Sequence, residues 1–386
     1  EPAGPTYLTL SAVEASSPCY EILNGSSQST RSLDVDTPAI AQEVHDRLAN
    51  AAKPLVMIGA GIPAHHADAL RDWLNTWGLP VAVTPKVKGI VDETHPNFVG
   101  VVGGMAIDSL MVNSIEQADL IVGIGFDPVE IDKLWHVDCP LLYIIDAPLA
   151  LNVVPHESVL IVEFTDLLSS LANMEAPCHW GDPFAKVREQ RLTIYQNSIG
   201  EDEPLAEQPV SIVRILAETL PAETIVTTDV GSHKYIFGQF WPSRHPSTFF
   251  MSNGLSGMGY GIAAAIGAKL ACPDVPVIAA VGDGGFSMNS QELETLKRLD
   301  APVIVVVLAD ESYSLIQLSQ ENKKLPRYGV DFDPIDSVKI ADACGVKGVR
   351  VTTPKELVNA ITGAIKNNEA LVVEIPINVA AYNGIV

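Results

Sequence analysis

The stretch Gly282-Asp283-Gly284-Gly285-Phe286 directly follows an apolar run. An amphipathic segment comes next, and after it a second apolar run that ends in an acid, Pro302-Val303-Ile304-Val305-Val306-Val307-Leu308-Ala309-Asp310. This pattern predicts a strand at 275–281, a helix at 289–300 and a strand at 303–309 of one parallel sheet. Both Asp283 and Asp310 then lie at the carboxyl ends of strands, where open α/β sheets bind ligands. Two carboxylates beside glycine backbone N–H groups suit a divalent metal ion that carries phosphates.

The composition limits the class of protein. The chain has 386 residues, of which 47% are hydrophobic and 18% charged, enough for a large core and two or three domains. It holds 24 basic and 47 acidic residues, a net charge of −23, so we expect neither nucleic acid nor an anionic membrane as a partner. Five scattered cysteines without a C-x-x-C pair predict no disulfide framework and no zinc site, and they favour a cytoplasmic location. The apolar runs are too short for a transmembrane helix.

Strands and helices alternate in two series along the chain, which predicts two doubly wound parallel-sheet α/β domains. We expect the first domain at 36–175, a polar linker with some helix at 176–209 and the second domain at 210–386. Residues 1–35 are expected to contribute one orphan strand, Thr6–Leu10, and a serine-rich tether.

Four successive strand ends of the second series carry glycines, small hydroxyls or acids. They are Asp229–His233, Asn253–Gly259, Gly282–Gly285 and Asp310–Tyr313. Each of them alone fits a tight turn, but four together at one sheet edge predict a ligand site. Asp283 and Asp310 are 27 residues apart (310 − 283), which is room for one helix and one strand, so the two acids should end adjacent strands.

The first series contains a weaker signal. Gly59-Ala60-Gly61 follows a strand, but Ala64 stands where the third glycine of the dinucleotide fingerprint would be. A tight turn is therefore favoured over a nicotinamide or flavin site, which stays open as an alternative. The segment Gly125–Glu130 ends another strand at the same edge and either lines a cleft or turns the chain.

The Gly282-Asp283-Gly284 motif and Asp310 together resemble the thiamine diphosphate motif, in which Gly-Asp-Gly is followed by a spacer and usually by Asn-Asn. The Asp in place of the second Asn resembles the catabolic, flavin-free acetolactate synthases. The turns Thr228–His233, Ser252–Gly261 and Gly125–Glu130 extend the resemblance over nearly the whole chain. The chain is thus identified by resemblance as acetolactate synthase-like, with a middle domain followed by a diphosphate-binding domain.

The resemblance implies a role for each residue of the predicted site. Asp283, Asp310 and the carbonyl of Ser312 would hold Mg²⁺. Met258 would bend the cofactor, and the backbone at Ser256 and Met258 would hold its aminopyrimidine. Further contacts with the cofactor are implied for Ser232, His233, Gly284, Gly285 and Tyr313.

The same resemblance implies where the substrate lies and which cofactor is absent. Ile316 and Ser319 would face a small 2-oxo acid, although the catabolic enzymes carry Gln at the position aligned with Ser319. No flavin is expected, because Gly125–Glu130 lacks the arginine of the flavin-binding synthases.

The resemblance implies a lyase or transferase that decarboxylates a 2-oxo acid and joins the product to a second carbonyl. Such enzymes have three domains, and residues 1–10 resemble only the last strand of the first, pyrimidine-binding domain. The glutamate of that domain that activates the cofactor has no match here. We therefore expect activity only with a separate pyrimidine-binding polypeptide, and assembly with further copies of this chain. The alternatives are a non-catalytic or regulatory cofactor-holding subunit and a simple 2-oxo acid decarboxylase.

Overall fold

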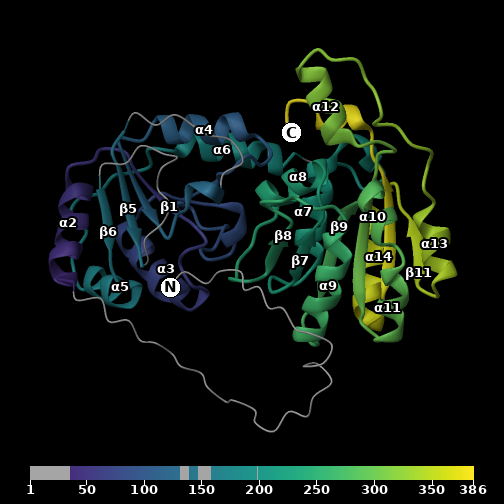
Figure 1. Cartoon of the computed structure of the whole chain (residues 1–386), viewed down its shortest axis with the longest axis horizontal. Helices are drawn as coiled ribbons and strands as arrows, with labels where there is room; N and C mark the ends of the chain where they lie inside the picture. The colour runs from purple at the N-terminus through teal and green to yellow at the C-terminus, as the bar shows by residue number, and fades with distance from the viewer. Residues whose placement is uncertain (1–34, 131–138, 147–157, 198) are drawn as a thin grey trace, which may run out of the picture.

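The computed structural model describes residues 35–130, 139–146, 158–197 and 199–386, which form two parallel six-stranded sheets with flanking helices (Figure 1). The predicted class, two doubly wound α/β domains, is confirmed. The predicted strand Thr6–Leu10 and its tether lie outside the described residues. No helix in the described ranges is long and apolar enough to cross a membrane.

The first sheet has the strand order β3-β2-β1-β4-β5-β6. From β1 the chain first adds strands on one side and then, with β4, on the other, so the topological switch point lies between β1 and β4. Helices α2, α3 and α5 pack together, as do α4 and α6. The strands are β1 (Pro54–Ile58), β2 (Val81–Val83), β3 (Phe98–Val101), β4 (Leu120–Ile124), β5 (Leu141–Ile145) and β6 (Ser158–Ile161). The helices are α2 (Thr37–Ala49), η1 (Ala64–His66), α3 (Ala67–Trp77), η2 (Pro85–Val87), α4 (Asp108–Glu116), η3 (Pro128–Glu130), α5 (Phe164–Ala172) and α6 (Ala185–Tyr195).

The second sheet has the order β11-β12-β10-β9-β7-β8, and its switch point lies between β7 and β9. The strands are β7 (Ile225–Thr228), β8 (Phe249–Met251), β9 (Val277–Gly282), β10 (Val303–Ala309), β11 (Lys347–Arg350) and β12 (Leu371–Pro376). The helices are η4 (Leu205–Glu207), α7 (Pro209–Thr219), α8 (Ser232–Phe240), α9 (Tyr260–Ala271), α10 (Asp283–Asn289), α11 (Glu292–Arg298), α12 (Ser314–Asn322), α13 (Ser337–Ala343), α14 (Pro354–Asn367) and η5 (Val379–Tyr382).

The central strands β9 and β10 are buried on both faces, which explains their uninterrupted apolar sequences. Val305 and its alternate neighbours pack in one core with Ile262 of α9 and Leu293 of α11. Val306, on the other face, belongs to a larger core that includes Leu216 of α7 and the apolar residues of the first domain. The larger of these two cores therefore extends through both domains.

The prediction of a single helix at 289–300 was wrong in its start and its continuity. Helical structure begins at Asp283 and is divided into α10 and α11. Gly284 and Gly285 disfavour a helix intrinsically, which is why the sequence did not predict this start. Close packing overrides that preference, since a Cβ on Gly285 would lie 2.7 Å from Asp229 Oδ2.

One further helix was missing from the expectation, and another agrees with it. Helix α2 was not predicted, although Asp36 accepts the N–H of Ala39 at 3.1 Å and Pro38 stands in the first turn, both typical of a helix start. Helix α6 agrees with the helix expected within the linker at 176–209. It packs against β3, where Arg191 is 5.0 Å from the ring of Phe98, and it also contacts α7 of the second domain.

A buried ion pair joins the two domains. The ammonium of Lys88 lies 2.5 Å from Glu93 Oε2, and the two side chains are 0% and 1% exposed. Lys88 also donates to the carbonyl of Trp241 at 2.9 Å, and Glu93 accepts the N–H of Ser243 at 3.2 Å. Both partners follow α8 in the second domain, so the charged pair fixes the end of that helix.

Helix α8 has a second attachment to the first domain through Gln239. Its side chain accepts the N–H of Val101 at 2.9 Å and donates to the carbonyl of Ala106 at 3.0 Å. Because the other end of α8 begins at the second sheet's switch point, these bonds position that edge of the sheet relative to the first domain.

Candidate active site

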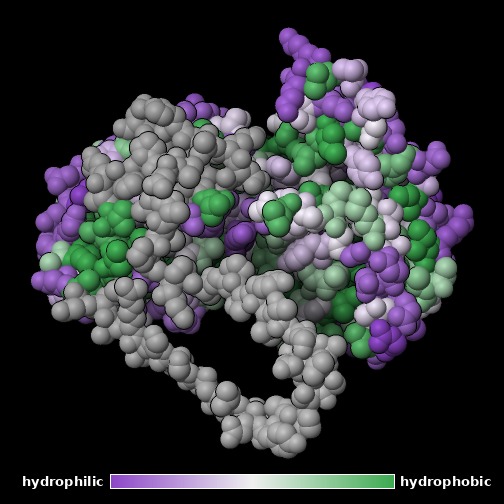
Figure 2. Space-filling model, in the orientation of Figure 1, coloured by the Kyte–Doolittle hydropathy of each residue, from purple (hydrophilic) through white to green (hydrophobic). Residues whose placement is uncertain are grey.

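A pocket lies at the carboxyl edge of the second sheet, at the switch point between β7 and β9. The turns after β7, β9 and β10 line it, together with the loop before α9 and the first turn of α12. Helix α12, whose first turn lines the pocket, projects from the second domain (Figure 1), and hydrophobic surface lies at the base of this helix (Figure 2). The sequence-predicted residues that line the pocket are Ser232, His233, Met258, Asp283, Gly284, Gly285, Asp310, Ser312, Tyr313 and Ile316.

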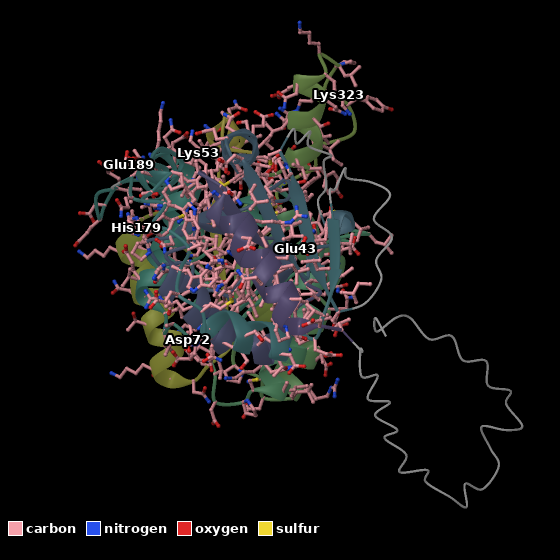
Figure 3. The ribbon with its side chains drawn as sticks, turned by 90° about the vertical axis from the view of Figure 1, so that its left-hand side faces the viewer. Glu43, Lys53, Asp72, His179, Glu189 and Lys323 are labelled. Carbon is pink, nitrogen blue, oxygen red and sulfur yellow. The ribbon has the colours of Figure 1, made fainter. Side chains whose placement is uncertain are left out.

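Two predicted site residues do not line this pocket. Ser319 is exposed on α12 three residues after Ile316, which lines the pocket and is 53% exposed. Ser256 lies in the loop between β8 and α9, with a positive φ of 49°. Lys323, just after α12, lies at the projecting end of that helix (Figure 3), away from the pocket that Ile316 lines. Ser319 therefore lies on the helix that carries Ile316 but outside the pocket lining.

Asp283 and Asp310 end adjacent strands, as the spacing predicted. Gly282 of β9 pairs with Leu308 of β10, so the acids follow by one and two residues. The two turns are joined directly, because Asp283 Oδ2 accepts the N–H of Glu311 at 2.8 Å. Glu311 has a φ of 57°, a left-handed conformation that a residue other than glycine adopts only where its surroundings enforce it.

Burial perturbs the two acids in a way that a cation would relieve. Burial raises the pKa of Asp310 to about 7, and the negative charge of Asp283 adds to this effect. Burial likewise raises the pKa of Asp283 to about 6. No group of three or more His, Cys, Asp or Glu residues suited to a metal exists among the described residues. A metal ion here would need backbone, water or phosphate oxygens besides these two carboxylates, a set that suits Mg²⁺.

Another part of the pocket lining suits an anion. His233 is 3% exposed, and its Nε2 has no hydrogen-bond partner within the described part of the chain. Burial lowers the pKa of His233 to about 3, so the ring is neutral near pH 7. The N-termini of α8 and α12 meet here, where the hydroxyls of Ser232 and Ser314 are 2.8 Å apart. The two helix N-termini favour phosphate oxygens, and the unpartnered Nε2 of the neutral ring leaves one polar atom of this lining for a ligand to complete. Ser314, which the sequence analysis missed, is marked only by its hydroxyl at a helix start.

Glycines shape the pocket by allowing close approach. A Cβ on Gly284 would lie 2.9 Å from the ring of Tyr313 and 3.5 Å from Met258 Cε, so it would crowd the space between these two side chains. A Cβ on Gly231 would lie 2.7 Å from the His233 ring, and its φ of 154° also favours glycine. At Gly231 and Gly284 the backbone therefore lies close to pocket-lining side chains, as the glycines predicted.

The predicted glycine turn of the first domain packs against another turn. The N–H of Gly61 donates to the carbonyl of Gly125 at 2.7 Å, across the switch point between β1 and β4. The carboxylate of Glu130 accepts the N–H of Ala60 at 3.0 Å and the hydroxyl of Thr84 at 2.6 Å. A dinucleotide diphosphate binds at such a turn, but here an internal carboxylate already accepts the Ala60 N–H. The geometry supports the tight-turn interpretation.

Comparison with known proteins identifies the two domains. Residues 229–375 match the C-terminal TPP binding domain of thiamine pyrophosphate enzymes, and residues 41–141 match their central domain. The acetolactate synthase of Bacillus subtilis is 28% identical over 360 residues, 86% of this chain and 60% of the relative. The acetolactate synthase isozyme 2 large subunit of Escherichia coli is 28% identical over 346 residues (86% and 61%). A probable acetolactate synthase large subunit of Methanocaldococcus jannaschii is 29% identical over 369 residues (86% and 59%). The chain thus spans about three fifths of the length of these relatives.

Proposed function

This chain belongs to the thiamine pyrophosphate enzymes, and on that premise we propose that its pocket binds thiamine diphosphate together with Mg²⁺. One observation carries the proposal: two buried carboxylates on adjacent strand ends line the same pocket as the N-termini of α8 and α12. A metal ion and a diphosphate would satisfy the carboxylates and the helix N-termini together. A lone phosphate would leave the carboxylates without a cation, and a metal without phosphate would leave the helix N-termini without an anion.

The proposed contacts divide between metal and cofactor. Asp283, Asp310 and the backbone carbonyl of Ser312 would coordinate Mg²⁺. Ser232, His233, Gly284, Gly285 and Tyr313 line the part of the pocket proposed for the diphosphate. Met258 and the backbone at Ser256 would hold the aminopyrimidine, while Ile316 and Ser319 would face the substrate.

Bound thiamine diphosphate supplies a nucleophilic carbon and an electron sink for decarboxylating a 2-oxo acid. The residues of this chain would orient that cofactor and exclude water from its diphosphate. We propose acetolactate formation, in which two pyruvate anions and one proton give one acetolactate anion and one CO₂. The relatives named acetolactate synthase support this reaction.

We also propose that catalysis requires a pyrimidine-binding domain that carries an activating glutamate, supplied by a second polypeptide or by a segment of the same protein. General acid–base help of this kind contributes about 10²–10⁴-fold to rate. The chain would assemble with further copies of itself around such sites, and we propose that it binds no flavin. Co-purification and intact mass would identify a partner domain of about 150–200 residues.

Thermal unfolding with thiamine diphosphate and Mg²⁺, followed by product analysis with pyruvate, tests the proposed function. We expect the cofactor to raise the melting temperature of the 386-residue chain. We expect CO₂ and acetolactate only after the pyrimidine-binding domain is added. No thermal shift, with or without that domain, would reject the cofactor assignment. CO₂ without acetolactate would indicate a simple decarboxylase, and binding without CO₂ a non-catalytic subunit.

Acidification should weaken cofactor binding while it stabilises the free protein. Asp310 and Asp283 must lose their protons to bind Mg²⁺, and their pKa values of about 7 and 6 place this competition between pH 8 and 6. In the free protein the same raised pKa values mean that the folded form binds protons more tightly than the unfolded chain, whose aspartates titrate near ~3.9. The destabilisation by the two charges is therefore complete above pH 7 and decreases as pH falls.

Melting temperatures measured from pH 8 to pH 6, with and without Mg²⁺ and thiamine diphosphate, test this prediction. We expect the ligand-induced increase to shrink as pH falls. In the Asp310→Asn variant, the ligand-induced increase in melting temperature should depend less on pH, because position 310 no longer takes up a proton. A ligand-induced increase that is constant across this range would contradict the assignment of the two acids to the metal.

A further inference from the structure

Lys234 is a buried cation beside the pocket that the proposed contacts leave without a role. It follows His233 in the first turn of α8 and is 1% exposed. Adjacent residues of a helix point in different directions, so the side chain of Lys234 points away from the part of the pocket that His233 lines. A buried ammonium is costly unless it is hydrogen-bonded, so its partners indicate what it does.

The ammonium of Lys234 reaches the loop between β8 and α9. It donates to Asn253 Oδ1 at 2.8 Å and to the Ser256 hydroxyl at 3.4 Å. That loop ends at Met258, whose side chain lines the pocket. Lys234 therefore connects the helix that starts at the proposed diphosphate site with the loop that carries Met258.

The middle of this loop needs such an attachment. Gly254 and Ser256 have positive φ angles of 90° and 49°, and Leu255 between them is fully exposed. The Ser252 hydroxyl donates to the carbonyl of Gly257 at 2.9 Å, which closes the loop, while a Cβ on Gly257 would meet only open space within 4 Å. A left-handed serine persists only where its surroundings over-determine it.

The far end of the loop is held separately. Gly259 donates its N–H to the two carboxylate oxygens of Asp229 at 3.0 and 2.9 Å, and its carbonyl accepts from Asn289. These bonds fix the residue after Met258 but not the segment from Asn253 to Ser256. That segment is the part which Lys234 contacts.

We propose that Lys234 is a positioning residue for the aminopyrimidine of the cofactor, because it fixes the loop 253–256 in the conformation that presents Ser256 and Met258 to the ligand. The inference rests on the proposed function. It distinguishes the two ends of the ligand, since Lys234 acts on the loop that would hold the ring and not on the diphosphate.

Binding of two probes to the Lys234→Met variant tests this inference. With Mg²⁺ present, we expect the variant to bind thiamine diphosphate about 10-fold more weakly, the usual size of a lost charged hydrogen bond. Inorganic pyrophosphate should bind within about 2-fold of wild type, because its contacts are unchanged. Equal weakening of both probes would show that Lys234 attracts the phosphates by charge, and no weakening of either would also overturn the proposal.

Two more variants keep the result interpretable. Lys269→Met is a matched control, because Lys269 is also a buried lysine of this domain and donates to the carbonyl of Val275 at 3.0 Å, outside the pocket. Asn253→Ala removes the same contact from the loop side and replaces Lys234→Met if that variant does not fold. The double variant Lys234→Met/Asn253→Ala should be no weaker than the weaker single variant, because both lose one shared interaction.

A measurement without cofactor separates this inference from the proposed function. Amide hydrogen exchange of residues 253–258 should be faster in Lys234→Met than in wild type and unchanged in Lys269→Met. Unchanged exchange in Lys234→Met would overturn the positioning role. If wild type bound pyrophosphate but gained nothing from the thiamine ring, the proposed function would fail, while the exchange result would still decide whether Lys234 fixes the loop.

Discussion

Replacing Asp283 by asparagine is expected to weaken Mg²⁺-dependent binding of thiamine diphosphate by about 100-fold, or ~2.7 kcal/mol. The substitution removes one of the two carboxylates at the ends of β9 and β10, and a neutral amide is a poorer ligand for a hard cation. Because the ion would bridge to the diphosphate, affinity for metal and cofactor should fall together. Titration calorimetry at fixed Mg²⁺ concentration measures this loss.

Without ligands, the same variant should be as stable as wild type at pH 8 or more stable. An asparagine oxygen can still accept the N–H of Glu311, which lies 2.8 Å from Asp283 Oδ2. The loss of one buried negative charge offsets the loss of the Gly284 N–H bond to Oδ1 at 2.9 Å, which an amide nitrogen cannot accept. Asp342→Asn is the matched control, because Asp342 is an exposed residue of α13 that does not line the pocket. Unchanged cofactor affinity in Asp283→Asn would reject Asp283 as a metal ligand.

Replacing Lys88 by methionine is expected to lower the free energy of unfolding by about 3–5 kcal/mol, because it leaves the carboxylate of Glu93 buried without its cation. The two side chains are 0% and 1% exposed, so solvent cannot compensate. Glu93 also accepts the N–H of Ser243, so the loss falls on the contact between the domains. Guanidinium unfolding followed by tryptophan fluorescence measures the change.

A second substitution separates charge from packing. In Lys88→Met/Glu93→Gln, a neutral amide can still accept the Ser243 N–H, so we expect more than half of the lost stability to return. Lys347→Met is the matched control, because the Lys347–Glu369 pair is 55% and 34% exposed and such pairs contribute only about 0–1 kcal/mol. Failure of the double variant to recover stability would show that the Lys88 side chain acts by packing rather than by pairing with Glu93.

Local pattern in the sequence was enough to predict the fold class and the position of the site. Uninterrupted apolar runs such as 303–309 belong to strands buried on both faces, and acids or glycines directly after them lie at one edge of a parallel sheet. The spacing from Asp283 to Asp310 therefore predicted adjacent strand ends, and the pairing of Gly282 with Leu308 agrees. Local capping also marks helix starts, and Asp36 before α2 is such a signal, although this helix was not among those predicted.

Contacts between segments distant in sequence decided the rest. Helix α10 begins at Asp283, against the preference of two glycines, because Asp229, directly after β7, lies so close to Gly285 that a side chain there would not fit. The pairing of Ser232 with Ser314, the unpartnered nitrogen of His233 and the reach of Lys234 to Asn253 each depend on side-chain directions that exist only after the sheet has formed. The sequence by itself determined which residues end the strands, because that depends on local periodicity. Only the tertiary structure decided which of them face one another, because burial and hydrogen bonding between distant segments set those directions.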